Sequence, residues 1–144
     1  MTKESICVAA LLIALGPLCV VPRAQQSGGK VKIIKINDPV PPSGGGPDSQ
    51  GDIAGDVEGV TNPEALKVVL YVHTDRWYVQ PLADSPYTDI AKDGKWSSWT
   101  HLGRRYAALL VLPSYHPEEK PLSLPPVGGD VLAKTERAAS SSGR

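Results

Sequence analysis

Apolar residues recur along this chain in short runs, and most of these runs have the length and composition of β-strands. Residues 67–73 (KVVLYVH) and 106–112 (YAALLVL) are the most continuous. Residues 76–80 (RWYVQ) follow the first of them after only two residues, and a glycine-rich run covers 53–60. β-Branched and aromatic residues are enriched in strands, and turn residues bound each run. The pattern therefore predicts a chain built mainly from short strands.

Two of the apolar runs leave an alternative open. Residues 106–112 end before Pro113 and are expected to form a buried central strand, although Ala-Ala-Leu-Leu would also suit a helix. A short β-like run at 31–36 either pairs with the domain or stands alone. Residues 127–134 are expected to add a last strand behind two glycines.

The strongest turn signal is Asp93-Gly94, which predicts a hairpin between residues 88–92 and 95–100. A two-residue loop would place Lys92 opposite Lys95, which is an unfavourable pair of like charges. A three-residue loop, with Gly94 in the left-handed region, avoids that pair.

The choice of loop decides which tryptophan of the second strand is buried, because a slip of one residue exchanges the two faces of a strand. The three-residue loop places Ala91 opposite Lys95 and Ile90 opposite Trp96. We favour this register, which predicts that Trp96 is buried and that Trp99 is the more exposed ring.

Short strands with turn signals every 8–12 residues are typical of an all-β antiparallel sandwich, here of six to seven strands over residues 52–137. Proline and glycine make up much of the preceding stretch, so we expect a flexible linker over 25–51. Residues 138–144 (AASSSGR) are expected to form a disordered tail.

The first 24 residues have the pattern of a secretory signal peptide. Lys3 precedes an uncharged apolar stretch that Gly16-Pro17 interrupts, and Ala24 suits the residue before a cleavage site. The apolar stretch is too short for the roughly 20 residues of a membrane anchor, so we expect no stable membrane insertion after cleavage. Cleavage would remove Cys7 and Cys19, which are the two cysteines of the chain, and would leave a mature domain without disulfides. Small secreted eukaryotic domains are often held by disulfides, so we expect a secreted, extracellular or periplasmic protein of a bacterium.

Charge and motifs exclude several function classes. Lys and Arg total 15, as do Asp and Glu, which argues against a nucleic-acid binder that works through bulk charge. The histidines are widely spaced, and the sequence contains no nucleophile elbow or phosphate-binding glycine loop. We therefore expect no metal, no cofactor and no catalytic residues, and regard a small hydrolase as the least favoured interpretation.

The aromatic residues are the informative candidates for binding. Trp77 and Tyr78 are adjacent, and Trp96 and Trp99 are three apart, so the members of each pair point to opposite faces of a regular strand. An exposed flat ring suits stacking on the apolar face of a sugar. We take Trp99, Tyr78 and Trp77 as candidate ligand-binding residues, against the alternative that each is part of the core.

Two sequence elements also suggest a family. The stretch Tyr71-Val72 with Trp77-Tyr-Val-Gln-Pro81, and Ile90 with Asp93-Gly-Lys-Trp-Ser97, resemble a small immunoglobulin-like β-sandwich module of bacterial secreted proteins. That module occurs alone or attached to glycoside hydrolases, and the resemblance covers about 57–134. It implies a non-catalytic accessory module and carries no ligand or site residue with it.

The sequence thus favours an exported, non-catalytic binding module for a polysaccharide or other cell-surface glycan. The alternative is a structural or protein–protein interaction module that binds a cell-surface protein.

Overall fold

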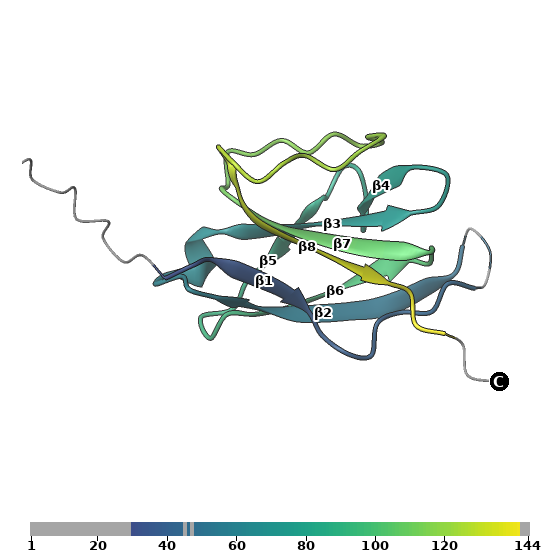
Figure 1. Ribbon diagram of the computed structural model, residues 1–144, viewed down its shortest axis with the longest axis horizontal. Helices are drawn as coiled ribbons and strands as arrows, with labels where there is room; N and C mark the ends of the chain where they lie inside the picture. The colour runs from purple at the N-terminus through teal and green to yellow at the C-terminus, as the bar shows by residue number, and fades with distance from the viewer. Residues whose placement is uncertain (1–29, 45, 47, 142–144) are drawn as a thin grey trace, which may run out of the picture.

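The computed structural model describes residues 30–44, 46 and 48–141, and within them the chain forms eight strands and one short 3₁₀ helix (Figure 1). The 3₁₀ helix covers Pro63–Ala65. The strands are β1 (Ile33–Ile36), β2 (Gln50–Glu58), β3 (Lys67–His73), β4 (Trp77–Gln80), β5 (Tyr87–Asp89), β6 (Lys95–His101), β7 (Arg105–Val111) and β8 (Val131–Ala138).

The strands form two antiparallel sheets that face each other, so the expected β-sandwich is confirmed. The smaller sheet has the order β1-β2-β6, and the larger has the order β4-β3-β7-β8, with β5 also paired to β3. The first, second and sixth strands therefore face a sheet whose centre is β3 and β7.

The main core lies between the two sheets. Alternate residues of β1 and β2 point inward, among them Ile34, Ile36 and Ile53, and they pack against the inner face of the larger sheet. Tyr106 and Leu110 of β7 are fully buried in this cluster. Burial of such side chains contributes roughly 1.5–3 kcal/mol each, which makes this layer the main source of stability.

A second apolar cluster lies on the outer face of the larger sheet. Val69 and Tyr71 of β3 and Leu109 of β7 belong to it, and residues 112–130, which we call the covering segment, run over it (Figure 1). Both faces of β3 and β7 are therefore buried, which explains why their sequences are continuously apolar rather than alternating.

Hydrogen bonds from the larger sheet hold the covering segment in place. The Tyr71 hydroxyl donates to the Glu118 carbonyl at 2.9 Å, and the backbone N–H of Val79 donates to the Glu119 carbonyl at 2.9 Å. The Lys134 ammonium donates to the Pro125 carbonyl at 3.1 Å. The segment thus also covers the outer edge of β4.

The strongest strand predictions are confirmed. Residues 67–73 form β3 as predicted, and residues 105–111 form the strand β7, so the helical alternative for 106–112 is wrong. The last strand begins at Val131 and extends to Ala138, rather than covering 127–134. Eight strands replace the six to seven expected, because β1, which the sequence left undecided, joins the smaller sheet.

The ordered domain extends beyond 52–137 on both sides. The run that the sequence left undecided forms β1, which pairs with β2 from Ile33 opposite Glu58 to Ile36 opposite Gly55. Val40, within the range expected to be linker, is buried in the core.

The turn of the predicted hairpin is confirmed, but the predicted pairing of its two arms is wrong. The turn has the three-residue form, since the Ala91 N–H donates to the Lys95 carbonyl at 2.8 Å and Gly94 has a φ of 87°. The two arms do not form a ladder, however, because β5 pairs with β3 while β6 pairs with β2. Asp93-Gly94 therefore lies at a crossing between the two sheets.

The expected signal peptide, residues 1–24, lies outside the described residues, as do residues 142–144 of the expected tail. Among the residues that are described, none forms a helix with the length and apolar character needed to cross a bilayer.

Candidate functional site

The three tryptophans lie in three different environments. Trp96 is 3% exposed and belongs to the core between the sheets, whereas Trp99, on the same strand, is half-buried on the opposite face. The prediction that Trp96 is buried and Trp99 is the more exposed ring is therefore confirmed. Trp77 is 6% exposed and lies in the cluster beneath the covering segment.

Trp77 is a packing residue in this structure rather than an available ring, because little of it reaches solvent. Its ring packs edge-on against His73 at a centroid distance of 4.8 Å. The Arg105 guanidinium lies over it at 5.8 Å from the centroid, within the range of a cation–π contact.

Tyr78 is half-buried and lies on the side of the larger sheet that faces the smaller one, since it is paired with Val72 of β3. Its hydroxyl donates to the Asp75 carboxylate at 2.9 Å. This hydrogen bond raises the pKa of Tyr78, and it is the main cause of the lowered pKa of Asp75. The three candidate residues thus do not converge, and Trp99 alone lies on the outer face of the smaller sheet.

The outer face of the smaller sheet is polar and open to solvent. Along β2 and β6, residues with outward side chains lie opposite one another in the ladder: Asp56 opposite Lys95, Ala54 opposite Ser97, and Asp52 opposite Trp99. The central pair, Ala54 and Ser97, has small side chains. The face is therefore low in the middle, with charged residues at one end and an aromatic ring at the other.

Trp99 lines a hollow of about 510 Å³ on this face, together with Asp52, Pro39 and neighbouring residues of β2, of β6 and of the segment that follows β1. The ring of His101 packs edge-on against Trp99, with centroids 5.3 Å apart and planes at 64°. Both the backbone N–H and Nδ1 of His101 lie within 2.9 Å of the Gln80 side-chain oxygen. These contacts hold the edge of the Trp99 ring and leave part of the ring in solvent.

A second hollow of about 630 Å³ continues from the first and shares Asn37, Ala54 and Ser97 with it. The Asn37 side-chain amide donates to the Asp56 carboxylate at 2.7 Å. We call the two hollows together the β2–β6 groove. It offers an aromatic platform, carboxylate and amide groups, and a floor of small residues.

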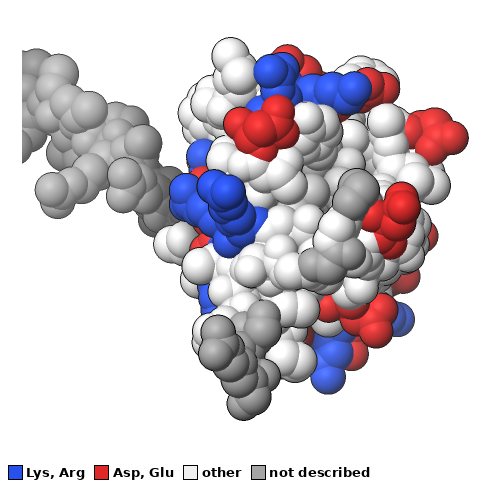
Figure 2. All heavy atoms as spheres, turned by 90° about the vertical axis from the view of Figure 1, so that its right-hand side faces the viewer, with Lys and Arg blue, Asp and Glu red and all other residues white. Residues whose placement is uncertain are grey.

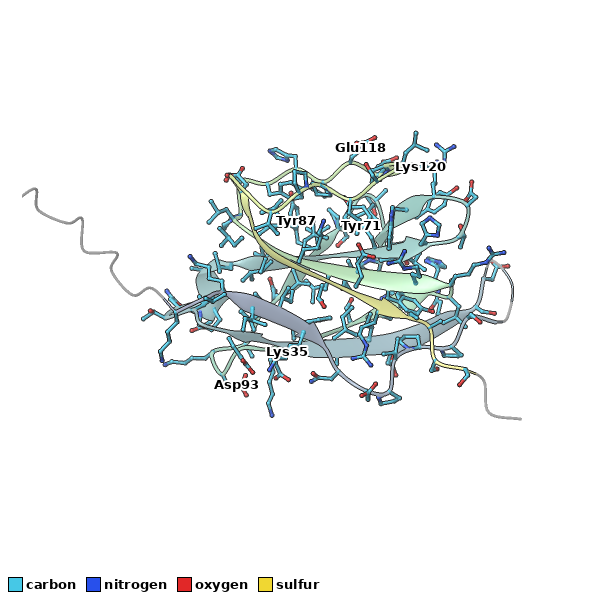
Figure 3. The ribbon with its side chains drawn as sticks, in the orientation of Figure 1. Lys35, Tyr71, Tyr87, Asp93, Glu118 and Lys120 are labelled. Atoms are coloured by element: carbon cyan, nitrogen blue, oxygen red, sulfur yellow. The ribbon has the colours of Figure 1, made fainter. Side chains whose placement is uncertain are left out.

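Two ion pairs lie on the β1 side of the groove. Lys35 pairs with Glu58 at 2.5 Å, and Arg137 pairs with Asp38 at 2.8 Å. Within the described part of the chain, the Asp52 carboxylate has no hydrogen-bond or ion-pair partner, so it is available beside Trp99. Figure 3 shows Lys35 and Asp93 on the side of the molecule opposite Glu118 and Lys120, so the groove and the covering segment lie on opposite faces.

Charge is mixed elsewhere on the surface. On the end of the molecule shown in Figure 2, Lys and Arg side chains lie among Asp and Glu rather than gathering into one basic patch. In the described ranges, no group of three or more His, Cys, Asp or Glu side chains is arranged to hold a metal ion.

Sequence reasoning missed the part of this site that follows β1. Asn37, Asp38 and Pro39 line the groove, yet they fall in the stretch expected to be linker, where proline and glycine dominate the composition. The signal that could have found them is the isoleucine-rich run 33–36, which has the composition of a strand and ends directly before Asn37.

Comparison of the chain with protein-family models, with curated proteins and with solved structures finds no match.

Proposed function

We propose that this protein is an exported, non-catalytic module that binds a carbohydrate, such as a polysaccharide of a cell surface, in the β2–β6 groove. The observation that carries the proposal is the half-buried Trp99 ring beside the unpartnered Asp52 carboxylate on an open sheet face. An aromatic ring stacks on the apolar face of a pyranose, while carboxylate and amide groups accept or donate hydrogen bonds to its hydroxyls.

The shape of the groove supports a chain-like ligand. The two hollows join through Ala54 and Ser97, whose small side chains leave a path along the face. A linear oligosaccharide could lie across this path with one residue on Trp99 and the next near Asn37 and Asp56. Its proposed export agrees with such a ligand, since glycans of this kind lie outside the cell.

Affinity electrophoresis of the full chain in gels with embedded polysaccharides, supported by a glycan array, tests the proposal. We expect at least one polysaccharide to retard the protein. The Trp99→Ala variant should lose most of that retardation, because the stacking platform is removed, and Trp99→Phe should keep part of it. Leu122→Ala is the matched control, since Leu122 is 79% exposed and belongs to the covering segment. Absence of retention on every glycan tested, or equal retention of Trp99→Ala and the native chain, would contradict the proposal.

A further inference from the structure

The edge of β6 that faces away from β2 carries backbone groups without partners. Ladder pairing directs the N–H and C=O groups of Trp96, Ser98 and Thr100 toward β2, as the adjoining Val57–Gly94 and Leu102–Ser49 hydrogen bonds show. The groups of residues 95, 97, 99 and 101 therefore point away from β2.

Both ends of this edge are already covered. The Lys95 carbonyl accepts from the Ala91 N–H, and the His101 N–H donates to the Gln80 side chain at 2.8 Å. Between them, Ser97 and Trp99 have no backbone partner in the described ranges, and the Trp99 carbonyl has only a 3.5 Å contact from the Ser98 hydroxyl. Of the other outer strands, β4 is hydrogen-bonded to the covering segment, and on β1 the Ile36 carbonyl accepts from Arg137. An open edge of this kind is a template for another strand.

We infer that a second copy of this chain pairs with it through β6, in antiparallel fashion about a two-fold axis at Ser98. In that register, Ser97 lies opposite Trp99 of the second copy and Trp99 lies opposite its Ser97. Each of these two pairs exchanges two N–H···O=C hydrogen bonds. This register uses the outward N–H and C=O groups of Ser97 and Trp99, and it does not need the groups of Lys95 and His101 that already have partners. A shift of two residues in either direction would instead require groups of Lys95 or His101 that already have partners.

The side chains fit the same register. The small side chain of Ser97 lies opposite the large side chain of Trp99. Lys95 lies opposite His101 rather than opposite another lysine, so the register avoids placing two lysines opposite each other. A flexible peptide would lose conformational entropy on binding so short an edge, whereas a second β6 is already ordered. These points favour a second copy over an extended peptide.

The pairing would also enlarge the site proposed above, and this consequence rests on the proposed function. The two Trp99 rings become diagonal neighbours across the new strand pair, about 7–8 Å apart, on one continuous outer face. Two rings at this spacing form a longer platform than either copy has alone.

Sedimentation equilibrium of the full chain without any glycan, from about 10 µM to about 1 mM, tests the pairing. The mass should rise from that of one chain toward twice that value. Ser97→Pro removes the outward N–H while leaving the ladder to β2 intact, and should remain monomeric. Ser97→Ala keeps the N–H and should associate like the native chain.

A native chain that stays monomeric over the whole range would overturn the inference, as would a Ser97→Pro variant that still dimerises. If Ser97→Pro fails to fold, amide exchange of the native chain decides instead. Exchange of the Ser97 and Trp99 N–H groups should slow several-fold with concentration, and unchanged exchange would count against the dimer. Because no glycan is present, these results are independent of whether the groove binds sugar.

Discussion

Gly55 occupies a position on β2 where no side chain can be accommodated. A β-carbon added there would collide with the Lys35 carbonyl oxygen of β1 and with the ring of Trp96 on β6. The glycine thus lets the indole lie flat against the backbone at the centre of the smaller sheet. Because Gly55 has no side chain, the smaller sheet has room to bury the Trp96 indole.

We therefore expect Gly55→Ala to lower the free energy of unfolding by about 2–3 kcal/mol, as overpacking of a core does. Gly44→Ala is the matched control, because nothing lies within 4 Å of the β-carbon it would add. Urea denaturation followed by tryptophan fluorescence measures both. Equal stability of the two variants would contradict the close contact between the Trp96 ring and the Gly55 backbone.

Tyr106 links the core to the segment that precedes β2. Its buried hydroxyl donates to the Pro42 carbonyl at 2.7 Å and accepts from the Gly103 N–H at 3.1 Å. Burial raises the pKa of this hydroxyl, so it stays neutral and able to donate at ordinary pH.

Loss of the Tyr106 hydroxyl in Tyr106→Phe should destabilise the fold by about 1–3 kcal/mol, because it leaves two backbone groups without their partner. Tyr78→Phe, which removes a hydroxyl bonded to the exposed Asp75 side chain, should change stability much less. Thermal unfolding by circular dichroism compares them. A Tyr106→Phe variant as stable as Tyr78→Phe would argue against this role.

At the scale of elements, the sequence predicted best those strands whose residues face an apolar environment on both sides. β3 and β7 are central strands, so their composition alone identifies them. β5 was predicted in the wrong pairing, because Asp93-Gly94 encodes a tight turn but not the sheet that each arm joins. β1 and the groove residues after it depend on pairing with distant strands, which local composition does not reveal.

The covering segment is the least regular element, and tyrosine hydroxyls anchor it. Tyr71 is 1% exposed, and burial raises its pKa above the ordinary range. Tyr115 also has a raised pKa, mainly through burial, and the Tyr87 hydroxyl donates to the Tyr115 carbonyl. Figure 3 shows Tyr71 and Tyr87 pointing from the sheet toward this segment.

A raised tyrosine pKa stabilises the fold fully below about pH 10, and the stabilisation is lost as pH rises through the folded-state value. Above pH 10 the native chain should therefore lose about 1.4 kcal/mol per pH unit more than Tyr71→Phe does, because only the native unfolded chain ionises at this residue. Urea unfolding at pH 8, 10 and 11 measures the difference. Parallel pH profiles for the two proteins would contradict it.

At the scale of the whole molecule, the two outer faces of the sandwich differ. The outer face of the larger sheet is apolar and lies beneath the covering segment, whereas that of the smaller sheet is polar, hollowed and exposed. A binding role for this domain is therefore expected on the smaller sheet, and on that face Trp99 is the ring available to a ligand.

The most direct measurement is a titration of the ¹⁵N-labelled full chain with an oligosaccharide of a polysaccharide that retards it, followed by NMR. The chain has three tryptophans, so its indole N–H signals report separately on the groove, the core and the covered face. We predict a shift of the Trp99 indole signal together with the amides of Asp52, Ala54 and Ser97, while the indoles of Trp96 and Trp77 stay unchanged. A ligand that leaves Trp99 and its neighbours unshifted, or that shifts mainly residues of 112–130, would contradict binding in the β2–β6 groove.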